Sequence, residues 1–304
     1  LAGLDAAEDT LRDWMGAPAQ YSMERVSSGD GTAPGGPVVV LVHGLDSRAE
    51  NLRAAASALA ARGYDAYLYS YPDDGRIERA ADHLGRRTRE IRKRTGRTAS
   101  LITTSMGGVI ARIYLELDPT YESEITTFIA CNPPFQGSWM ANYHELWELA
   151  ESTVDLVTQG LAGSPVHDGL GQASTQLLPN STLMLKLRQA DRRAGVRYSI
   201  LAGAAPVADP ALLDAADILV AAARPADNAP WAHLALDLTA ELIETARQHG
   251  HHGDGAVILA NQTLRGVTDR VVRSDIHHLA ALSPGKDGKI YWLKEILERL
   301  PPVR

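Results

Sequence analysis

Apolar and polar positions follow one another along this chain in patterns that predict strands and helices in alternation. The clearest strand pattern is VVVLV at residues 38–42, an unbroken β-branched run that is typical of a strand buried on both faces. The segment DAYLYSY at 65–71 predicts the next strand, after an alanine-rich helical pattern that ends at Gly63. By the same criteria, further strands are expected at 99–104, 125–132, 197–203 and 269–273.

Helical spacing of apolar residues fills the intervals between these strands. Helices are expected at 51–63, 76–94, 107–117 and 290–300. Because strands and helices alternate, the chain is predicted to have an α/β fold, in which a mostly parallel central sheet is flanked by helices on both faces.

The chain is expected to divide into an N-terminal segment, residues 1–37, and one large domain, residues 38–304. The segment contains an amphipathic helical pattern at 4–15 and an alternating pattern at 21–26 that is typical of a half-buried edge strand. A stretch rich in glycine and proline then leads into the first buried strand.

Two long stretches of the large domain, at about 137–192 and 205–250, interrupt the order of strands and helices. Both carry helical patterns and no strand pattern. Stretches of this length inside a compact α/β domain usually serve a function. They are therefore expected to be helical insertions that form a lid or cap.

Composition restricts the classes of function. The 304 residues are 45% hydrophobic and 22% charged, with a formal net charge of −7, as in an ordinary soluble globular protein. This acidic balance argues against a phosphate-binding surface, so no nucleic-acid partner is expected, and the basic stretch 76–97 is interpreted as the solvated face of a helix. The single cysteine, Cys131, excludes an intramolecular disulfide and is expected to be a buried, inert thiol.

The sequence leaves the compartment open. No apolar stretch approaches the roughly 18 residues that span a bilayer. The chain begins with Leu1 rather than methionine, which favours a processed chain that is secreted or periplasmic, with a cytoplasmic location as the alternative. Nothing in the pattern decides the oligomeric state.

Ser105 stands at the junction of the strand expected at 99–104 and the helix that follows it. Ligand chemistry in parallel sheets gathers at the carboxyl ends of the strands, and a tight strand-to-helix turn there would hold the hydroxyl clear of the backbone. The helix N-terminus would direct its amides at the same point. A nucleophilic serine and a plain helix N-cap are both consistent with this position taken on its own.

A second candidate element follows the strand at 38–42, which ends in the dipeptide HG. The backbone amides of Leu45 and Met106 could converge on one point near Ser105 and form an oxyanion hole. His43 itself is expected to pack under this loop in a structural role.

Together these stretches resemble the α/β-hydrolase fold, and within it the group of bacterial lipases and esterases, over about residues 36–300. The segment CNPPFQGS at 131–138 is similar to a proline-rich segment with a Gly-Ser tail in those enzymes, and LLPNSTLMLKLRQ at 177–189 resembles their proline-serine-leucine segment. One departure is Thr103, because the family's turn usually has glycine two residues before the serine. We interpret it as a variant that constrains the turn.

The resemblance implies a catalytic triad in the chain order serine, acid, histidine, with Ser105 as the nucleophile. Two residues are candidates for the acid. Asp254, in GDGAV, is similar to an Asp-Gly-x-Val element of the family and is favoured, whereas Asp209 has the bare topological position after the strand at 197–203. The acid would orient the histidine and stabilise its imidazolium.

Two adjacent residues are candidates for the base, His277 and His278, which follow the last predicted strand. Family members place the catalytic histidine before a Leu-x-x-Leu stretch that opens the closing helix, and Leu279 and Leu282 give that spacing to His278. His278 is therefore favoured, and His277 would face solvent or support it.

The resemblance implies a serine hydrolase that cleaves carboxylic esters through an acyl-enzyme, a lipase or carboxylesterase. Its substrate would be a small-molecule or lipid ester, reached through transient contact with a membrane or lipid interface. Leu146, Trp147 and Leu149, at helical spacing in the first insertion, would contact the acyl chain or belong to the core. The alternatives on the same fold are an acyltransferase, an amidase or peptidase, and a binding module without a working nucleophile.

No cofactor and no metal ion are expected. His249, His251 and His252 lie close together in QHGHHGD, but metal ligands normally need a fixed spacing on an ordered element. We interpret this cluster as a polar surface loop.

Overall fold

A computed structural model describes most of the chain. The described residues are 21–26, 35–45, 47–73, 75–138, 172–205, 253–285 and 288–303, with the single positions 237, 240 and 244. The helix expected at 4–15 and most of both insertions lie outside these residues.

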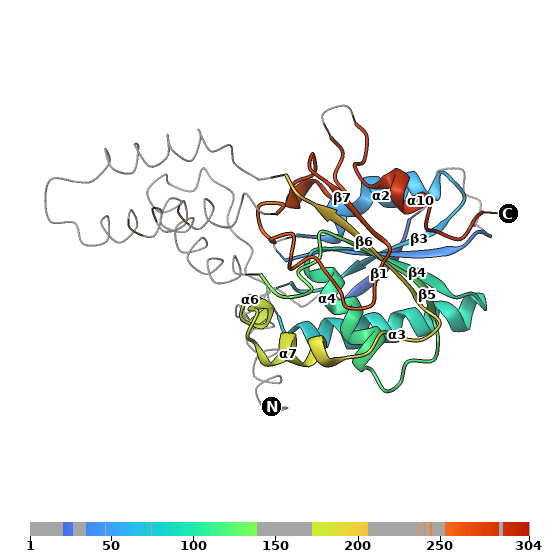
Figure 1. Cartoon of the computed structure of the whole chain (residues 1–304). Coiled ribbons are helices and arrows are strands. Elements are labelled where there is room, and N and C mark those ends of the chain that lie inside the picture. Colours follow the sequence, from blue (N-terminus) through green and yellow to red (C-terminus); the bar gives the residue numbers. More distant parts are fainter. Residues whose placement is uncertain are drawn as a thin grey trace, which may run out of the picture.

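Within this part of the chain, seven strands form one sheet in the order β1–β3–β2–β4–β5–β6–β7 (Figure 1). The strands are β1 (Ser22–Arg25), β2 (Val38–Val42), β3 (Asp65–Ser70), β4 (Ala99–Thr104), β5 (Ile125–Cys131), β6 (Arg197–Gly203) and β7 (Arg270–Arg273). At one edge β1 pairs antiparallel with β3, and every other pair of neighbours is parallel. The predicted α/β class with a mostly parallel sheet is confirmed.

Helices cover both faces of this sheet (Figure 1). One face carries α2 (Arg53–Ala60) and α10 (Leu293–Leu297), and the other carries α3 (Ile77–Thr95), α4 (Met106–Arg112) and α7 (Thr182–Gln189). The short helix α6 (Gln172–Leu177) precedes α7 and contacts α3. Among the described residues, no helix is long and apolar enough to cross a membrane.

The burial of β2 explains why its sequence is an unbroken apolar run. Val38, Val40 and Val42 pack into a cluster that contains residues of α3 and α4, whereas Val39 and Leu41 pack into a second cluster with residues of α2 and α10. All five side chains are fully buried. Burial on both faces removes the alternating polar positions that a half-exposed strand would show.

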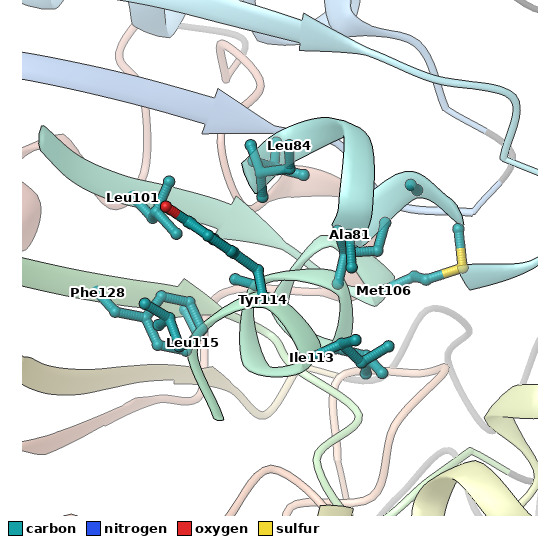
Figure 2. Packing of buried hydrophobic residues seen from close by; sticks show 14 of the residues in the cluster. Ala81, Leu84, Leu101, Met106, Ile113, Tyr114, Leu115 and Phe128 are labelled. Carbon is teal, nitrogen blue, oxygen red and sulfur yellow. The ribbon is translucent and has the colours of Figure 1, made fainter. Parts of the chain in front are cut away.

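The helix after Ser105 is fixed by close packing between the sheet and α3. Figure 2 shows part of this cluster, to which Leu101 of β4, Phe128 of β5 and Leu84 of α3 contribute. Tyr114 packs directly on α3, because a Cβ added to Gly85 would lie 2.9 Å from its ring. A core this close allows little movement of the element that follows the serine.

The helix expected at 107–117 is observed in two parts. After α4 the chain forms a π-helical turn, Ile113–Leu117, and Glu116 of this turn makes a buried ion pair at 2.9 Å with Arg112, the last residue of α4. The Glu116 carboxylate also contacts Arg192 at 3.1 Å. Over so short a stretch, apolar spacing does not distinguish one π turn from a continuous α-helix.

The closing helix is shorter than the expected span of 290–300. It is reduced to α10, Leu293–Leu297. Ile290 cannot belong to the helix, because it pairs with Pro284 in an isolated antiparallel bridge. Trp292 precedes the helix and is fully buried, which anchors this end of the chain on the sheet.

Candidate active site

Ser105 occupies a sharp turn between the end of β4 and the start of α4. Its backbone angles, φ 48° and ψ −125°, are uncommon for a residue other than glycine. The turn is held on both sides, since the Ser105 amide donates to the Cys131 carbonyl at 3.0 Å and the Ser105 carbonyl accepts from the Gly108 amide at 2.9 Å. The strand-to-helix turn expected at this serine is therefore present.

Two glycines allow the backbone to approach this turn. A Cβ added to Gly107 would lie 2.5 Å from the carbonyl oxygen of His43, at the end of β2. A Cβ added to Gly44 would lie 2.8 Å from the Cβ of Ser105. No larger residue fits at either position without a shift of the backbone, so the loop after β2 lies directly beside the serine.

Thr103 stands where the family's turn usually has glycine, and its surroundings accommodate it. The side chain is fully buried. A Cβ added to Gly108, on the facing turn of α4, would lie 3.4 Å from the Thr103 hydroxyl and 3.2 Å from Phe135. The threonine therefore fits sterically, although its hydroxyl is buried without a hydrogen-bond partner among the described residues.

Of the two adjacent histidines, His278 contacts the serine. Its Nε2 lies 2.8 Å from the Ser105 Oγ, and its Nδ1 lies 2.9 Å from the Asp254 Oδ2. The His278 side chain is 12% exposed. The Nδ1 of His277, by contrast, is buried without a hydrogen-bond partner.

The expectation that Leu279 and Leu282 open the closing helix is wrong. His278 begins a short 3₁₀ turn, His278–Ala280, and α10 starts only at Leu293. Leu282 is buried in the core, whereas Leu279 is 74% exposed. Of the two leucines, only Leu282 therefore anchors the loop that contains His277 and His278, which we call the histidine loop.

Asp254 is fully buried and holds the histidine from the other side. Its Oδ1 accepts the backbone amides of Val257 at 2.8 Å and Ala256 at 3.1 Å, which leaves Oδ2 directed at His278. The His278 amide also donates to the Asp254 carbonyl at 2.8 Å. The alternative acid, Asp209, lies outside the described residues.

These neighbours act on the pKa of His278 in opposite directions. Burial lowers the pKa of the imidazole, because it disfavours the charged form. The negative charge of Asp254 and the hydrogen bond to it raise the pKa by more, so the pKa of His278 is above its ordinary value. An imidazole in this environment can accept a proton from Ser105 and hold it as an imidazolium.

The residues expected to form an oxyanion hole follow two neighbouring strands. Met106 is the first residue of α4, and Leu45 follows Gly44, which lies against Ser105. In the described part of the chain, the amides of Leu45 and Met106 have no hydrogen-bond partner. Their role as an oxyanion hole stays a prediction.

His43 packs beneath this loop. Its Nδ1 lies 2.9 Å from the Gly44 carbonyl oxygen, and its ring stacks on Tyr71 at 4.0 Å between centroids. The Tyr71 hydroxyl donates to the His43 carbonyl at 2.7 Å. These contacts give His43 the structural role that was expected of it.

The remaining candidates are one buried cysteine and residues that lie outside the described part of the chain. Cys131 is fully buried, and burial raises the pKa of its thiol well above the usual range, as expected for an inert cysteine. Leu146, Trp147, Leu149 and the three clustered histidines His249, His251 and His252 lie outside the described residues. Elsewhere in the described residues, no group of three histidine, cysteine or acidic side chains could hold a metal ion.

Two buried amide side chains near the site, Asn132 and Gln262, were not anticipated. Asn132 bonds to the backbone of the histidine loop, and Gln262 bonds to the carbonyls of Gly203 and Val257. The Asn-Pro step at 132–133 predicts a turn at the end of a strand. It carries no signal for a contact with residues so distant in the sequence.

No protein-family model and no curated protein sequence matches the chain. Among solved structures, the mature form of Bacillus licheniformis lipase BlEst2 is similar, with a TM-score of 0.55 and 19% identity over 86% of this chain and 91% of the lipase. The chain covers 50% of the propeptide form of that lipase. The metagenomic carboxyl esterase MGS0156 has a TM-score of 0.55 and 18% identity over 90% of this chain and 73% of the esterase. Lipase 1 from Pelosinus fermentans has a TM-score of 0.56 and 13% identity over 87% of this chain and 99% of the lipase. From its sheet order, its helical layers and these likenesses, the chain has the α/β-hydrolase fold.

Proposed function

We propose that this protein is a serine hydrolase that cleaves carboxylic esters through a Ser105–His278–Asp254 triad. The observation that supports this most is the unbroken series of two hydrogen bonds, 2.8 Å from Ser105 to His278 and 2.9 Å from His278 to Asp254. The likeness in fold to two lipases and a carboxyl esterase favours an ester as the substrate.

In the acylation half of the reaction, the Ser105 Oγ attacks the ester carbonyl carbon while His278 Nε2 takes the hydroxyl proton. Negative charge then develops on the former carbonyl oxygen, and the amides of Leu45 and Met106 stabilise it. Collapse of this intermediate breaks the bond to the alcohol. His278 returns the proton to the leaving oxygen, and the acyl group remains on Ser105.

In the deacylation half, water takes the place of the alcohol. His278 accepts a proton from the water as it attacks the acyl carbon, and returns that proton to Ser105 as the carboxylic acid leaves. Asp254 accepts a hydrogen bond from the Nδ1–H of His278 throughout, which keeps Nε2 directed at the serine and stabilises the imidazolium.

The substrate is proposed to be a hydrophobic small-molecule or lipid ester, with the first insertion as part of the acyl-binding wall. Leu146, Trp147 and Leu149 supply the apolar side chains in this proposal. A wall contributes binding energy only to acyl chains long enough to touch it. Replacing all three residues with alanine should therefore reduce turnover of long-chain esters more than turnover of an acetate ester. An equal loss of turnover at every chain length would indicate that these residues belong to the core and not to an acyl-binding wall.

Hydrolysis of a series of p-nitrophenyl esters by the wild type and by Ser105→Ala tests the proposed function. We expect turnover in the wild type and loss of turnover in Ser105→Ala on the order of a thousandfold or more. Ser123→Ala is the matched control, because Ser123 also has a positive φ, 63°, and is exposed. Activity that survives in Ser105→Ala would reject the proposal.

A further inference from the structure

We propose that Asn132 is a positioning residue, whose carboxamide fixes the backbone of His277 and His278 against the strand beside the serine turn. The proposal rests on the proposed function, because it assigns Asn132 to the same site. Asn132 follows the last residue of β5 and is fully buried.

All of the strong hydrogen-bonding groups of the Asn132 side chain are engaged. Its Nδ2 donates to the carbonyl of His277 at 3.2 Å and to the carbonyl of His278 at 3.4 Å. Its Oδ1 accepts the amide of Gly203 at 2.9 Å. One side chain thus joins the ends of β5 and β6 to the loop that carries the histidine.

The same stretch of β5 also holds the serine turn. The Cys131 carbonyl, directly before Asn132, accepts the Ser105 amide at 3.0 Å. Ser105 and His278 are therefore both held by the same short stretch of backbone, Cys131 and Asn132. Ser105 is held through a main-chain hydrogen bond, and His278 is held through the Asn132 side chain. A shift of Asn132 would change the distance between the two reacting atoms.

The connection continues to the acid. Gly203, whose amide Asn132 holds, offers its carbonyl to the Gln262 Nε2 at 2.9 Å. Gln262 also donates to the Val257 carbonyl at 3.1 Å, and the Val257 amide binds Asp254. A continuous set of buried hydrogen bonds therefore runs from Asn132 to the loop that carries the acid.

The backbone at this position favours asparagine. Its φ is 52°, in the left-handed region that asparagine tolerates better than most residues with a Cβ. Gly203 lies close to the Asn132 side chain. A Cβ added to Gly203 would lie 3.0 Å from both the Nδ2 and the Oδ1 of Asn132, and 2.5 Å from the Ile276 carbonyl oxygen. Glycine can adopt the same φ at position 132, so Asn132→Gly removes the carboxamide without straining the backbone conformation.

The test compares Asn132→Gly with the wild type in steady-state kinetics on p-nitrophenyl acetate. A misplaced base costs turnover rather than binding, so we expect kcat to fall about 10- to 100-fold with KM nearly unchanged. Ser199→Ala is the matched control, because it removes a partly buried side-chain hydrogen bond, to Asp269 at 2.6 Å, near the start of β6 and away from Gly203. It should leave kcat unchanged.

A second readout does not depend on ester turnover. The proton between His278 Nδ1 and Asp254 should give a far-downfield proton NMR signal that is absent from His278→Ala. We expect Asn132→Gly to weaken or shift this signal and Ser199→Ala to leave it in place. If no ester were hydrolysed at all, the proposed function would fail while this signal still tested Asn132.

Asn132→Asp provides a further test should Asn132→Gly not fold. An aspartate has the same size and can accept the Gly203 amide, but its carboxylate cannot donate to the two histidine carbonyls. In mildly alkaline buffer it should lose kcat and the downfield signal as Asn132→Gly does. Wild-type kcat and an unchanged signal in a folded variant, or an equal kcat loss in Ser199→Ala, would overturn the proposal.

Discussion

The imidazole Nε2 of His278 lies 2.8 Å from the hydroxyl oxygen of Ser105, although 173 positions separate the two residues in the chain. The sheet brings them together, because Ser105 follows β4 and His278 follows β7, and parallel strands end at the same edge. Asp254, in the segment between β6 and β7, completes the set.

The two adjacent histidines should differ sharply in their effect on turnover. We expect His278→Ala to lose on the order of a thousandfold or more in kcat on a soluble ester, since only His278 reaches Ser105. His277→Ala should lose far less. Steady-state kinetics of both single variants on one ester measures this. A nearly inactive His277→Ala beside an active His278→Ala would show that His277 is the base and would contradict the assignment to His278.

Asp254→Asn should change the pH dependence of kcat/KM as well as its size. The base must be neutral to accept the serine proton, so kcat/KM falls as the pH drops below the pKa of His278. The charge of Asp254 raises that pKa and burial lowers it. Removing the charge leaves the burial, so the acid limb should move to lower pH while kcat falls on the order of 10³- to 10⁴-fold.

A pH–rate profile of both proteins checks this shift. Asp269→Asn is a suitable control, because Asp269 pairs with Arg299 and bonds to Ser199, away from the histidine. An acid limb that stays in place or moves to higher pH in Asp254→Asn would contradict the account of the His278 pKa.

Gly44→Ala should impair catalysis through space alone. Its Cβ would lie 2.8 Å from the Ser105 Cβ, so either the serine or the loop that carries Leu45 must move. We expect a large loss of kcat, because the nucleophile and the oxyanion amides are displaced relative to each other. Gly35→Ala is the control, since a Cβ there meets nothing within 4 Å. Equal activity of the two variants would show that the close approach is unimportant.

The sequence predicted the sheet well because burial leaves a simple mark on it. The apolar run of β2 and the β-branched residues of β4 and β5 each follow from packing on both faces. Ser105 stood out because it lies where a predicted strand meets a predicted helix, and the resemblance of the surrounding stretches favoured a nucleophile over a helix N-cap. These are local patterns, and local patterns are what a sequence displays.

The contacts that position the site are not local, and the sequence did not predict them. Nothing in its own neighbourhood distinguishes Asn132 from a turn asparagine, because its partners lie in Gly203 and in the histidine loop. The choice of His278 over His277 rested on an expected leucine spacing at a helix that begins elsewhere. The residue favoured on that spacing is nevertheless the one that contacts Ser105.

The central claim is that Ser105 is an activated nucleophile, and covalent labelling measures this most directly. A fluorophosphonate reacts with a serine whose hydroxyl is activated by a neighbouring base, and peptide mass spectrometry identifies the residue that carries the label. The account predicts one labelled residue, Ser105, in the wild type, with no labelling of Ser105→Ala and strongly slowed labelling of His278→Ala. A folded wild type that takes no label, or a label on any other serine, would contradict it.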